Sequence, residues 1–77
     1  MKRRIESSID GAQAHVVTDG HHYEAVVVAR AFEGISRVKQ HRMVYATLRE
    51  ELKEQVHALA LQTYTPEKWA AHQAANS

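Results

Sequence analysis

Apolar residues recur at helical spacing in two segments of the chain. The first is a stripe at every fourth position from Met1 to Ile9, and Gly11 behind it can close a short amphipathic helix in a left-handed conformation. The helical pattern returns at Ser36, whose hydroxyl suits a helix cap, and predicts a helix that ends near residues 53–55. The positions expected on the apolar seam of this second helix are Val38, His41, Tyr45, Leu48 and Leu52.

Two strands are predicted between these helices. Residues 14–18 and 23–32 flank the turn signal Asp19-Gly20, so we expect them to form an antiparallel pair. Residues 26–28 are three consecutive valines, which makes both faces of the second strand apolar there. Such a run is typical of the middle of a sheet.

A third strand and a last helix complete the predicted fold. The strand is expected over residues 56–64, with its leucines on one face, and Thr65 and Pro66 then start a helix that Trp69 would anchor on the core. Because a whole helix separates the second and third strands, a right-handed crossover should make them parallel. The prediction is an α/β domain with a three-stranded mixed sheet and helices packed on it.

Length and composition limit the classes of function. Residues 1–77 are enough for a single domain, and a net charge of +1 argues against indiscriminate nucleic-acid binding. The absence of cysteine excludes a thiol nucleophile and a metal site built on the chain's own thiolates. There is also no nucleophile elbow and no phosphate loop, so we expect no enzyme activity. Neither a membrane-spanning run nor a signal peptide is apparent, so a cytoplasmic location is expected.

The histidines are the candidate metal ligands. His21 and His22 are adjacent beside the turn, and on an extended chain they would point to opposite sides, which disfavours binding of one metal by both. His57 opens the third strand, and its spacing alone favours a partly buried structural histidine. His41, on the predicted apolar seam, is interpreted as structural too. His15 and His72 have no supporting pattern.

Several stretches together resemble the BolA family. They are the turn histidines before Tyr23 and the sequences F-E-G at residues 32–34, R-V-K-Q-H-R-M-V-Y at 37–45 and V-H-A-L-A-L-Q-T-Y-T-P-E-K-W at 56–69. The likeness covers nearly all of the chain after the first helix and is closest to the short bacterial members. The resemblance implies a class II KH-like fold with the order α-β-β-α-β-α, which agrees with the topology predicted above.

The resemblance also implies a function. Members of this family pair with monothiol glutaredoxins and share a glutathione-bound [2Fe-2S] cluster with them, in iron–sulfur trafficking or in iron and stress sensing. The implied ligands are His57, in the H-A-L motif, and His22, directly before Tyr23, with His21 as the alternative loop ligand. The partner's cysteine and glutathione would supply the other ligands, so the isolated chain, a monomer or weak dimer, should bind no cluster.

Two alternatives stay open. Some relatives are DNA-binding transcription regulators of the stress response, and a basic stripe on the second long helix would serve that role here. Its residues are Arg37, Lys39, Arg42, Arg49 and Lys53. Against it, the turn E-G-I-S lacks the second glycine of the KH clamp for nucleic acid. The other alternative is an interaction module whose histidines never bind metal.

Overall fold

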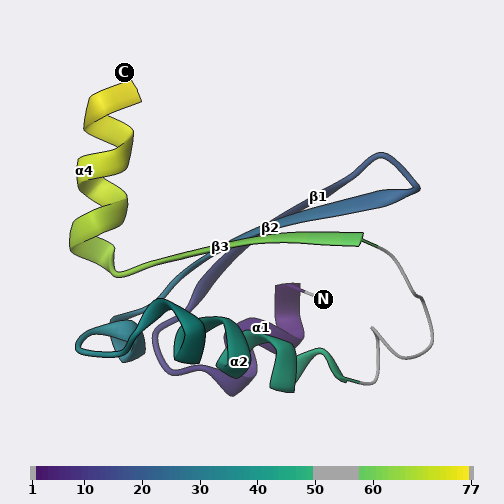
Figure 1. Cartoon of the computed structure of the whole chain (residues 1–77), viewed down its shortest axis with the longest axis horizontal. Coiled ribbons are helices and arrows are strands. Elements are labelled where there is room, and N and C mark those ends of the chain that lie inside the picture. Colours follow the sequence, from purple (N-terminus) through teal and green to yellow (C-terminus); the bar gives the residue numbers. More distant parts are fainter. Residues whose placement is uncertain (1, 50–57, 77) are drawn as a thin grey trace.

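The computed structural model describes residues 2–49 and 58–76 (Figure 1). Its elements follow the predicted order, with a short 3-10 helix, η1, added after the second strand. The bounds are α1 Lys2–Ser8, β1 Gln13–Thr18, β2 His22–Val28, η1 Arg30–Phe32, α2 Arg37–Thr47, β3 Ala58–Tyr64 and α4 Pro66–Asn76. No helix in the described residues is long and apolar enough to cross a membrane.

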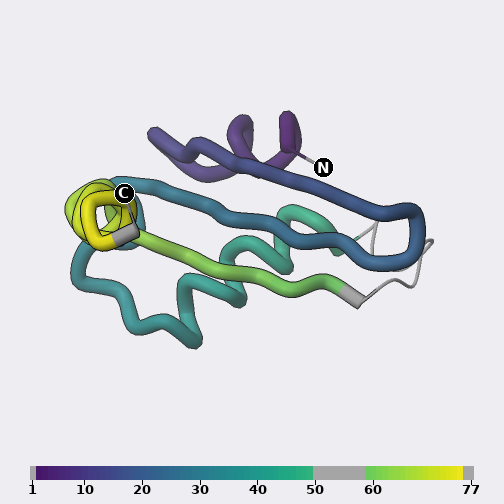
Figure 2. The backbone as a smooth tube through the Cα atoms, turned by 90° about the horizontal axis from the view of Figure 1, so that it is seen from above, coloured from purple at the N-terminus to yellow at the C-terminus, as the bar shows by residue number. Residues whose placement is uncertain are grey.

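The three strands form one mixed sheet in the order β1-β2-β3, as predicted. β1 and β2 are antiparallel and pair Ala14 with Val27, whereas β2 and β3 are parallel and pair Val28 with Tyr64. Figure 2 shows β2 between the other two strands. β2 is the central strand, as its run of three valines predicted, and Val27 and Val28 on its two faces are both buried.

The hydrophobic core lies between one face of the sheet and helices α1 and α2, which are on the same side (Figure 1). Each large side chain buried there stabilises the fold by roughly 1.5–3 kcal/mol relative to an exposed one. Leu59 and Leu61 of β3 pack against this core on one face, as expected. The core residues are Ile5, Ile9, Ala14, Val27, Ala29, Phe32, Val44 and Leu48.

The first helix has the predicted amphipathic stripe and glycine cap. Ile5 and Ile9 are both buried, and the backbone N–H of Ala12 donates to Ile9 O at 3.1 Å. Gly11 closes the turn with a φ of 68°, in the left-handed region that favours glycine. A carboxylate oxygen of Glu6 accepts a hydrogen bond from the N–H of Ala14 at 3.1 Å and ties α1 to β1.

The second strand is shorter than predicted, because β2 ends at Val28 rather than at Phe32. The last bond to β3 is donated by Ala29 N to Tyr64 O at 3.1 Å, and the chain then turns as η1. This turn buries Ala29 and Phe32 completely in the core. The apolar residues after Val28 are therefore core residues of a turn, which an apolar run alone does not distinguish from a strand.

The second long helix begins as predicted, with the Ser36 hydroxyl accepting a hydrogen bond from Lys39 N at 3.3 Å. Its end is different, since α2 stops at Thr47 and Leu48 takes the cap position. The predicted end at residues 53–55 lies outside the described residues.

The buried face of α2 agrees only in part with the predicted seam. Val38 and Tyr45 are 62% and 39% exposed, whereas Gln40, Val44 and Leu48 are buried. His41 is half-buried, and Leu52 lies outside the described residues. The difference arises because Gln40, a polar residue, occupies a core position.

The side chain of Gln40 satisfies all of its hydrogen-bonding groups in that core position. Its Nε2 donates to Phe32 O at 3.2 Å and to Ile35 O at 2.7 Å, and its Oε1 accepts from the Thr63 hydroxyl at 2.7 Å. A fully hydrogen-bonded amide can be buried at little cost. This network joins α2 both to the turn after η1 and to β3.

The last helix starts where predicted but does not lie on the core. The Thr65 hydroxyl accepts a hydrogen bond from Lys68 N at 3.2 Å, and Pro66 is the first helical residue. Figure 1 shows α4 projecting from the sheet on the side opposite α1 and α2. Trp69 therefore anchors α4 on the uncovered face of the sheet, not on the core as expected.

Four rings make up that anchor, which we call the aromatic cluster: His15, Tyr64, Trp69 and His72. The Trp69 ring stacks on His15 with centroids 6.1 Å apart and on His72 with centroids 5.6 Å apart. Tyr64 of β3 contacts both Trp69 and His72 with centroids 5.2 Å apart. Such ring pairs each contribute about 0.5–1.5 kcal/mol beyond the area that they bury.

Candidate functional site

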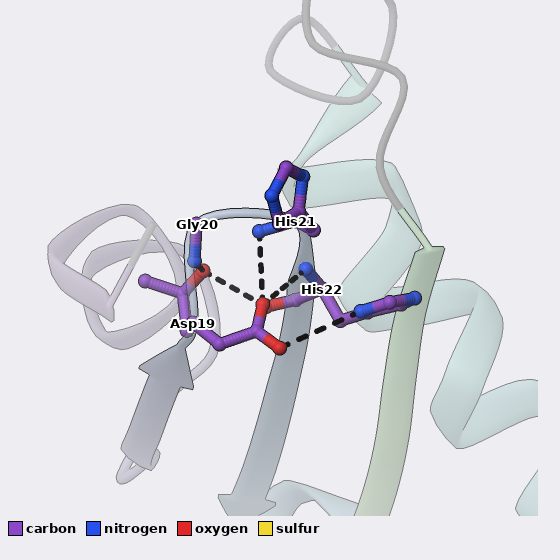
Figure 3. A network of polar contacts seen from close by, with 5 residues as sticks. Asp19, Gly20, His21 and His22 are labelled. Carbon is purple, nitrogen blue, oxygen red and sulfur yellow. Dashed lines mark hydrogen bonds and ion pairs between the residues drawn. The ribbon is translucent and has the colours of Figure 1, made fainter.

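The turn between β1 and β2 is held by the side chains of Thr18 and Asp19, and Figure 3 shows Asp19 beside the two histidines. Asp19 Oδ1 accepts hydrogen bonds from the backbone N–H groups of His21 and His22, both at 2.8 Å. The Thr18 hydroxyl donates to His22 O at 2.8 Å and accepts from Gly20 N at 3.0 Å. The aspartate thus adds a side-chain turn to the backbone bond that Asp19 N donates to His22 O at 3.3 Å, and both histidines come directly after Gly20.

Asp19 also contacts the side chain of His22. Its Oδ2 lies 3.6 Å from Nδ1 of the imidazole, and both side chains are exposed, at 67% and 69% respectively. The backbone hydrogen bonds from His22 and His21 lower the pKa of Asp19 below the ordinary value of 3.8. The carboxylate is therefore charged at neutral pH, and it faces one nitrogen of the imidazole while leaving Nε2 exposed to ligands.

This carboxylate was missed in the sequence, where no acid stood out as placed to orient either candidate ligand. The available signal was the Asp-Gly turn itself, since an aspartate that caps a tight turn lies beside the residues that follow it. A carboxylate on the second nitrogen of a ligating histidine is a common feature of metal sites.

The two turn histidines point in different directions. Figure 3 shows the His22 imidazole extending toward β3, whereas the His21 imidazole extends away from the hairpin. His22 is the first residue of β2, and its backbone pairs with Ala58, the first residue of β3. The geometry therefore agrees with the expectation that the two side chains do not bind one metal together.

The other predicted ligand, His57, lies outside the described residues. It directly precedes Ala58 in the sequence, and Ala58 is the β3 residue paired with His22. Within residues 2–49 and 58–76, no group of three or more His, Cys, Asp or Glu side chains is arranged to hold a metal ion.

A shallow cavity of about 280 Å³ lies beside His22 on the uncovered face of the sheet. Asp19 and Glu24 line it together with His22, and Val17 forms an apolar wall. A metal-bound imidazole at this point would have carboxylates on one side and open solvent on the other. One histidine with an oriented ring fits one ligand position of a shared centre, not a complete site.

The remaining histidines have structural surroundings. His41 is half-buried on α2, which agrees with its interpretation as a structural residue. His15 and His72 flank Trp69 in the aromatic cluster. Nothing in the sequence pattern predicted that cluster, because its rings come from three elements that meet only in the folded chain.

The predicted basic stripe is only partly present on α2. Arg37, Lys39 and Arg42 are exposed on this helix, but Arg49 follows its last residue. Lys53 lies outside the described residues. The described part of the stripe therefore has fewer aligned positive charges than a helix running to residues 53–55 would present.

Comparison with known sequences identifies the relatives of this chain. The sequence model of the family described as "BolA-like protein" matches residues 5–68. The acid stress protein IbaG of Escherichia coli (strain K12) is 39% identical over 59 residues, 75% of this chain and 70% of the relative. The DNA-binding transcriptional regulator BolA of the same strain is 44% identical over 63 residues, 79% of this chain and 60% of the relative.

Solved structures agree with these matches. A BolA protein homologue from Coxiella burnetii is 38% identical, with a TM-score of 0.78 over 90% of both chains. The BolA domain of SufE1 from Arabidopsis thaliana is 31% identical, with a TM-score of 0.75 over 86% of this chain and 87% of that one. The match between sequence, strand order and fold leads to one conclusion: this chain belongs to the BolA-like protein family.

Proposed function

We propose that this chain is an adaptor that binds a monothiol glutaredoxin and gives histidine ligands to a [2Fe-2S] cluster shared with it. The proposed ligands are His22 and His57, and the partner's cysteine and glutathione would complete the set. The cluster is cargo to be transferred or sensed, in iron–sulfur trafficking or in the response to iron and stress.

The observation that carries this proposal is the parallel register of β2 and β3. It pairs His22 with Ala58, so the loop ligand lies beside the residue that follows His57 in the sequence. In a shifted register the two ends of these strands would not meet. The register thus supports a site shared by two segments that are far apart in the chain.

The surroundings of His22 support a ligand role as well. Its imidazole is exposed, points toward β3 and has Asp19 next to Nδ1, which leaves Nε2 for a metal outside the chain. Imidazole binds iron well, and histidine in place of thiolate raises the reduction potential of a [2Fe-2S] cluster. A histidine ligand can also be released from the metal by protonation, which suits a cluster that is to be transferred to another protein.

A partner is required by composition. The chain contains no cysteine, so thiolate ligands to the cluster must come from another molecule. The hairpin turn lies at the end of the strands farthest from α4, and its exposed position leaves room for a second protein (Figure 1).

The test is anaerobic reconstitution with a monothiol glutaredoxin, iron, sulfide and glutathione, followed by absorption and EPR spectra. We expect His22→Ala and His57→Ala each to change the spectra toward those of the glutaredoxin alone. His21→Ala is the matched control, because this adjacent imidazole points away from β3 and should leave the spectra as they are. Spectra that are the same with and without both ligand histidines would contradict the assignment.

Asp19 gives a second, graded test of the same site. If it orients His22, then Asp19→Ala should weaken cluster retention about tenfold without abolishing it, since lost outer contacts typically cost that much. Asp10→Ala, which removes an exposed carboxylate outside the turn, is the control. Equal retention in the two variants would remove Asp19 from the site.

DNA binding is the second candidate function. Two observations favour it. A relative bears the name DNA-binding transcriptional regulator, and Lys39 and Arg42 are both exposed, about one helical turn apart on α2. A salt titration of duplex DNA binding tests it, because each phosphate contact steepens the salt dependence. Lys39→Glu with Arg42→Glu should abolish the binding and leave the cluster spectra intact, and no affinity at low salt would exclude this function.

A further inference from the structure

A second cavity, of about 350 Å³, lies at the opposite end of β3 from the hairpin turn. Three elements form its walls: α2 with Arg37 and His41, the last residues of β3, and α4 with His72. We call this cavity the edge notch. The cluster proposal does not use it, and Arg37 is the one residue of the basic stripe that lines it.

The floor of the edge notch is the outer edge of β3. Among the described residues, β3 pairs with β2 alone and stands at one side of the sheet (Figure 2). Tyr64 O accepts from Ala29 N, so the peptide groups of Tyr64 face β2. Alternation along the strand then turns the backbone N–H and C=O groups of Leu61 and Thr63 outward, where another strand could pair with them.

One wall of the edge notch carries a positive charge, that of Arg37. Arg37 is exposed and has a permanent charge, and His41 follows it one helical turn later on the same side of α2. His72 approaches from α4. None of the described residues that line the notch is an aspartate or glutamate, so its charge is not neutralised from within.

A buried hydrogen bond between α2 and β3 fixes the position of these walls. Gln40, between Arg37 and His41 in the sequence, accepts a hydrogen bond from the Thr63 hydroxyl at 2.7 Å in the buried layer. The same side chain holds the turn before α2 through Ile35 O at 2.7 Å. The position of Arg37 and His41 relative to the outward backbone groups of Thr63 is therefore fixed before a partner binds. Such preorganisation favours binding.

We propose that the edge notch binds an extended, acidic segment of a partner protein. The segment adds to the sheet as a fourth strand beside β3, pairing with the outward groups of Leu61 and Thr63. A carboxylate side chain of the segment enters the notch and bonds to the guanidinium of Arg37, with His41 beside it. This surface lies at the other end of β3 from His22, so the proposal does not rest on cluster binding.

A peptide fits these groups better than a nucleic acid does. The outward C=O groups of Leu61 and Thr63 need hydrogen-bond donors, and a phosphodiester backbone offers only acceptors. A peptide strand offers donors and acceptors alternately, at the spacing of β3 itself. The positive wall then selects acidic segments over neutral ones, which gives the binding its specificity.

The experiment is an NMR titration of the full, isotope-labelled chain without iron. The probe is the peptide acetyl-Thr-Val-Glu-Val-Thr-amide, whose alternating valines favour an extended strand. We expect shifts of the amide signals of Leu61 and Thr63 and of the Arg37 and His41 signals. The glutamine version of the peptide should bind about tenfold more weakly, because a charge-assisted hydrogen bond is lost.

Two further arms separate strand addition from simple charge attraction. A glutamate peptide with N-methylated backbone amides keeps its charge but cannot pair with β3, so it should not bind. Arg37→Gln should weaken the glutamate peptide about tenfold. The matched variant Arg42→Gln removes the same charge from α2 outside the notch and should leave affinity unchanged.

Several results would overturn the proposal. They are absence of binding by the glutamate peptide, equal binding by its N-methylated form, and signal shifts confined to other surfaces. A thymidine oligonucleotide that shifts the notch signals when the peptide does not would assign the surface to nucleic acid instead. Because no iron or glutaredoxin is present, none of these outcomes bears on the cluster test.

Discussion

The two ends of the sheet are held by different interactions. The hairpin end, residues 18–22, depends on exposed hydrogen bonds that the Thr18 hydroxyl donates and the Asp19 carboxylate accepts. The opposite end depends on burial of Phe32, on the buried network of Gln40, and on the aromatic cluster. The contrast suggests a division of roles, in which one end supplies stability and the other presents accessible side chains.

The largest expected difference between the ends is in the core. Phe32→Ala removes a fully buried ring and should lower the free energy of unfolding by about 3–5 kcal/mol. Val17→Ala, at a 60% exposed position near the hairpin, should change it by less than about 0.5 kcal/mol. Urea denaturation followed by circular dichroism measures both. Similar losses in the two variants would mean that the ends do not differ as described.

The buried amide of Gln40 should have the next largest effect. Gln40→Ala leaves Phe32 O, Ile35 O and the Thr63 hydroxyl without this partner, at an expected cost of about 1–3 kcal/mol in unfolding free energy. Gln62→Ala, which loses an exposed contact with Tyr64, is the control and should be nearly neutral. If the two variants unfold at the same urea concentration, the network does not stabilise the fold.

A smaller effect is expected at Trp69. Trp69→Ala removes the ring that contacts His15, Tyr64 and His72. Because this ring is only half-buried and both histidines are exposed, each contact should be at the low end of its range, and unfolding free energy should fall by about 1–2 kcal/mol. The loss should be local, with faster hydrogen exchange of the α4 amides and little change in β1 or β2. Lys68→Ala, at the neighbouring exposed position, should leave exchange in α4 as it is.

The smallest effect belongs to the hairpin end and depends on pH. Because the pKa of Asp19 is lowered in the folded chain, its charge stabilises the fold above the unfolded-state value and this contribution disappears as pH falls through the folded value. Asp19→Asn keeps a side-chain oxygen as an acceptor for the turn but removes the titrating carboxylate, so the variant should lose stability less steeply in that acid range. Thermal unfolding across the range, with Asp10→Asn as control, checks the difference.

The strand order and the caps could be predicted because local signals fix them. The valine run put β2 at the centre, Ser36 and Thr65 began their helices, and Gly11 closed α1. These features depend on residues adjacent in the chain. The family resemblance then named the fold that the local signals had already outlined.

Features that depend on distant partners could not be predicted. The buried face of α2 was predicted only in part, because Gln40 has the pattern of a surface residue until Phe32, Ile35 and Thr63 meet it. The end of β2 was wrong because an apolar residue in a turn has the same pattern as one in a strand. At the candidate site, the roles of His22 and His57 were predicted from resemblance, and Asp19 was added only by the turn geometry.

The parallel pairing of β2 and β3 has a consequence for when the chain becomes competent to bind. A hairpin between neighbouring strands closes quickly, whereas a parallel pair must wait until the whole crossover through α2 has closed. His22 thus meets the first residue of β3 only after that crossover has closed. A newly made or partly unfolded chain would present His22 without β3 beside it, so under the proposed function only the fully folded chain would offer the site.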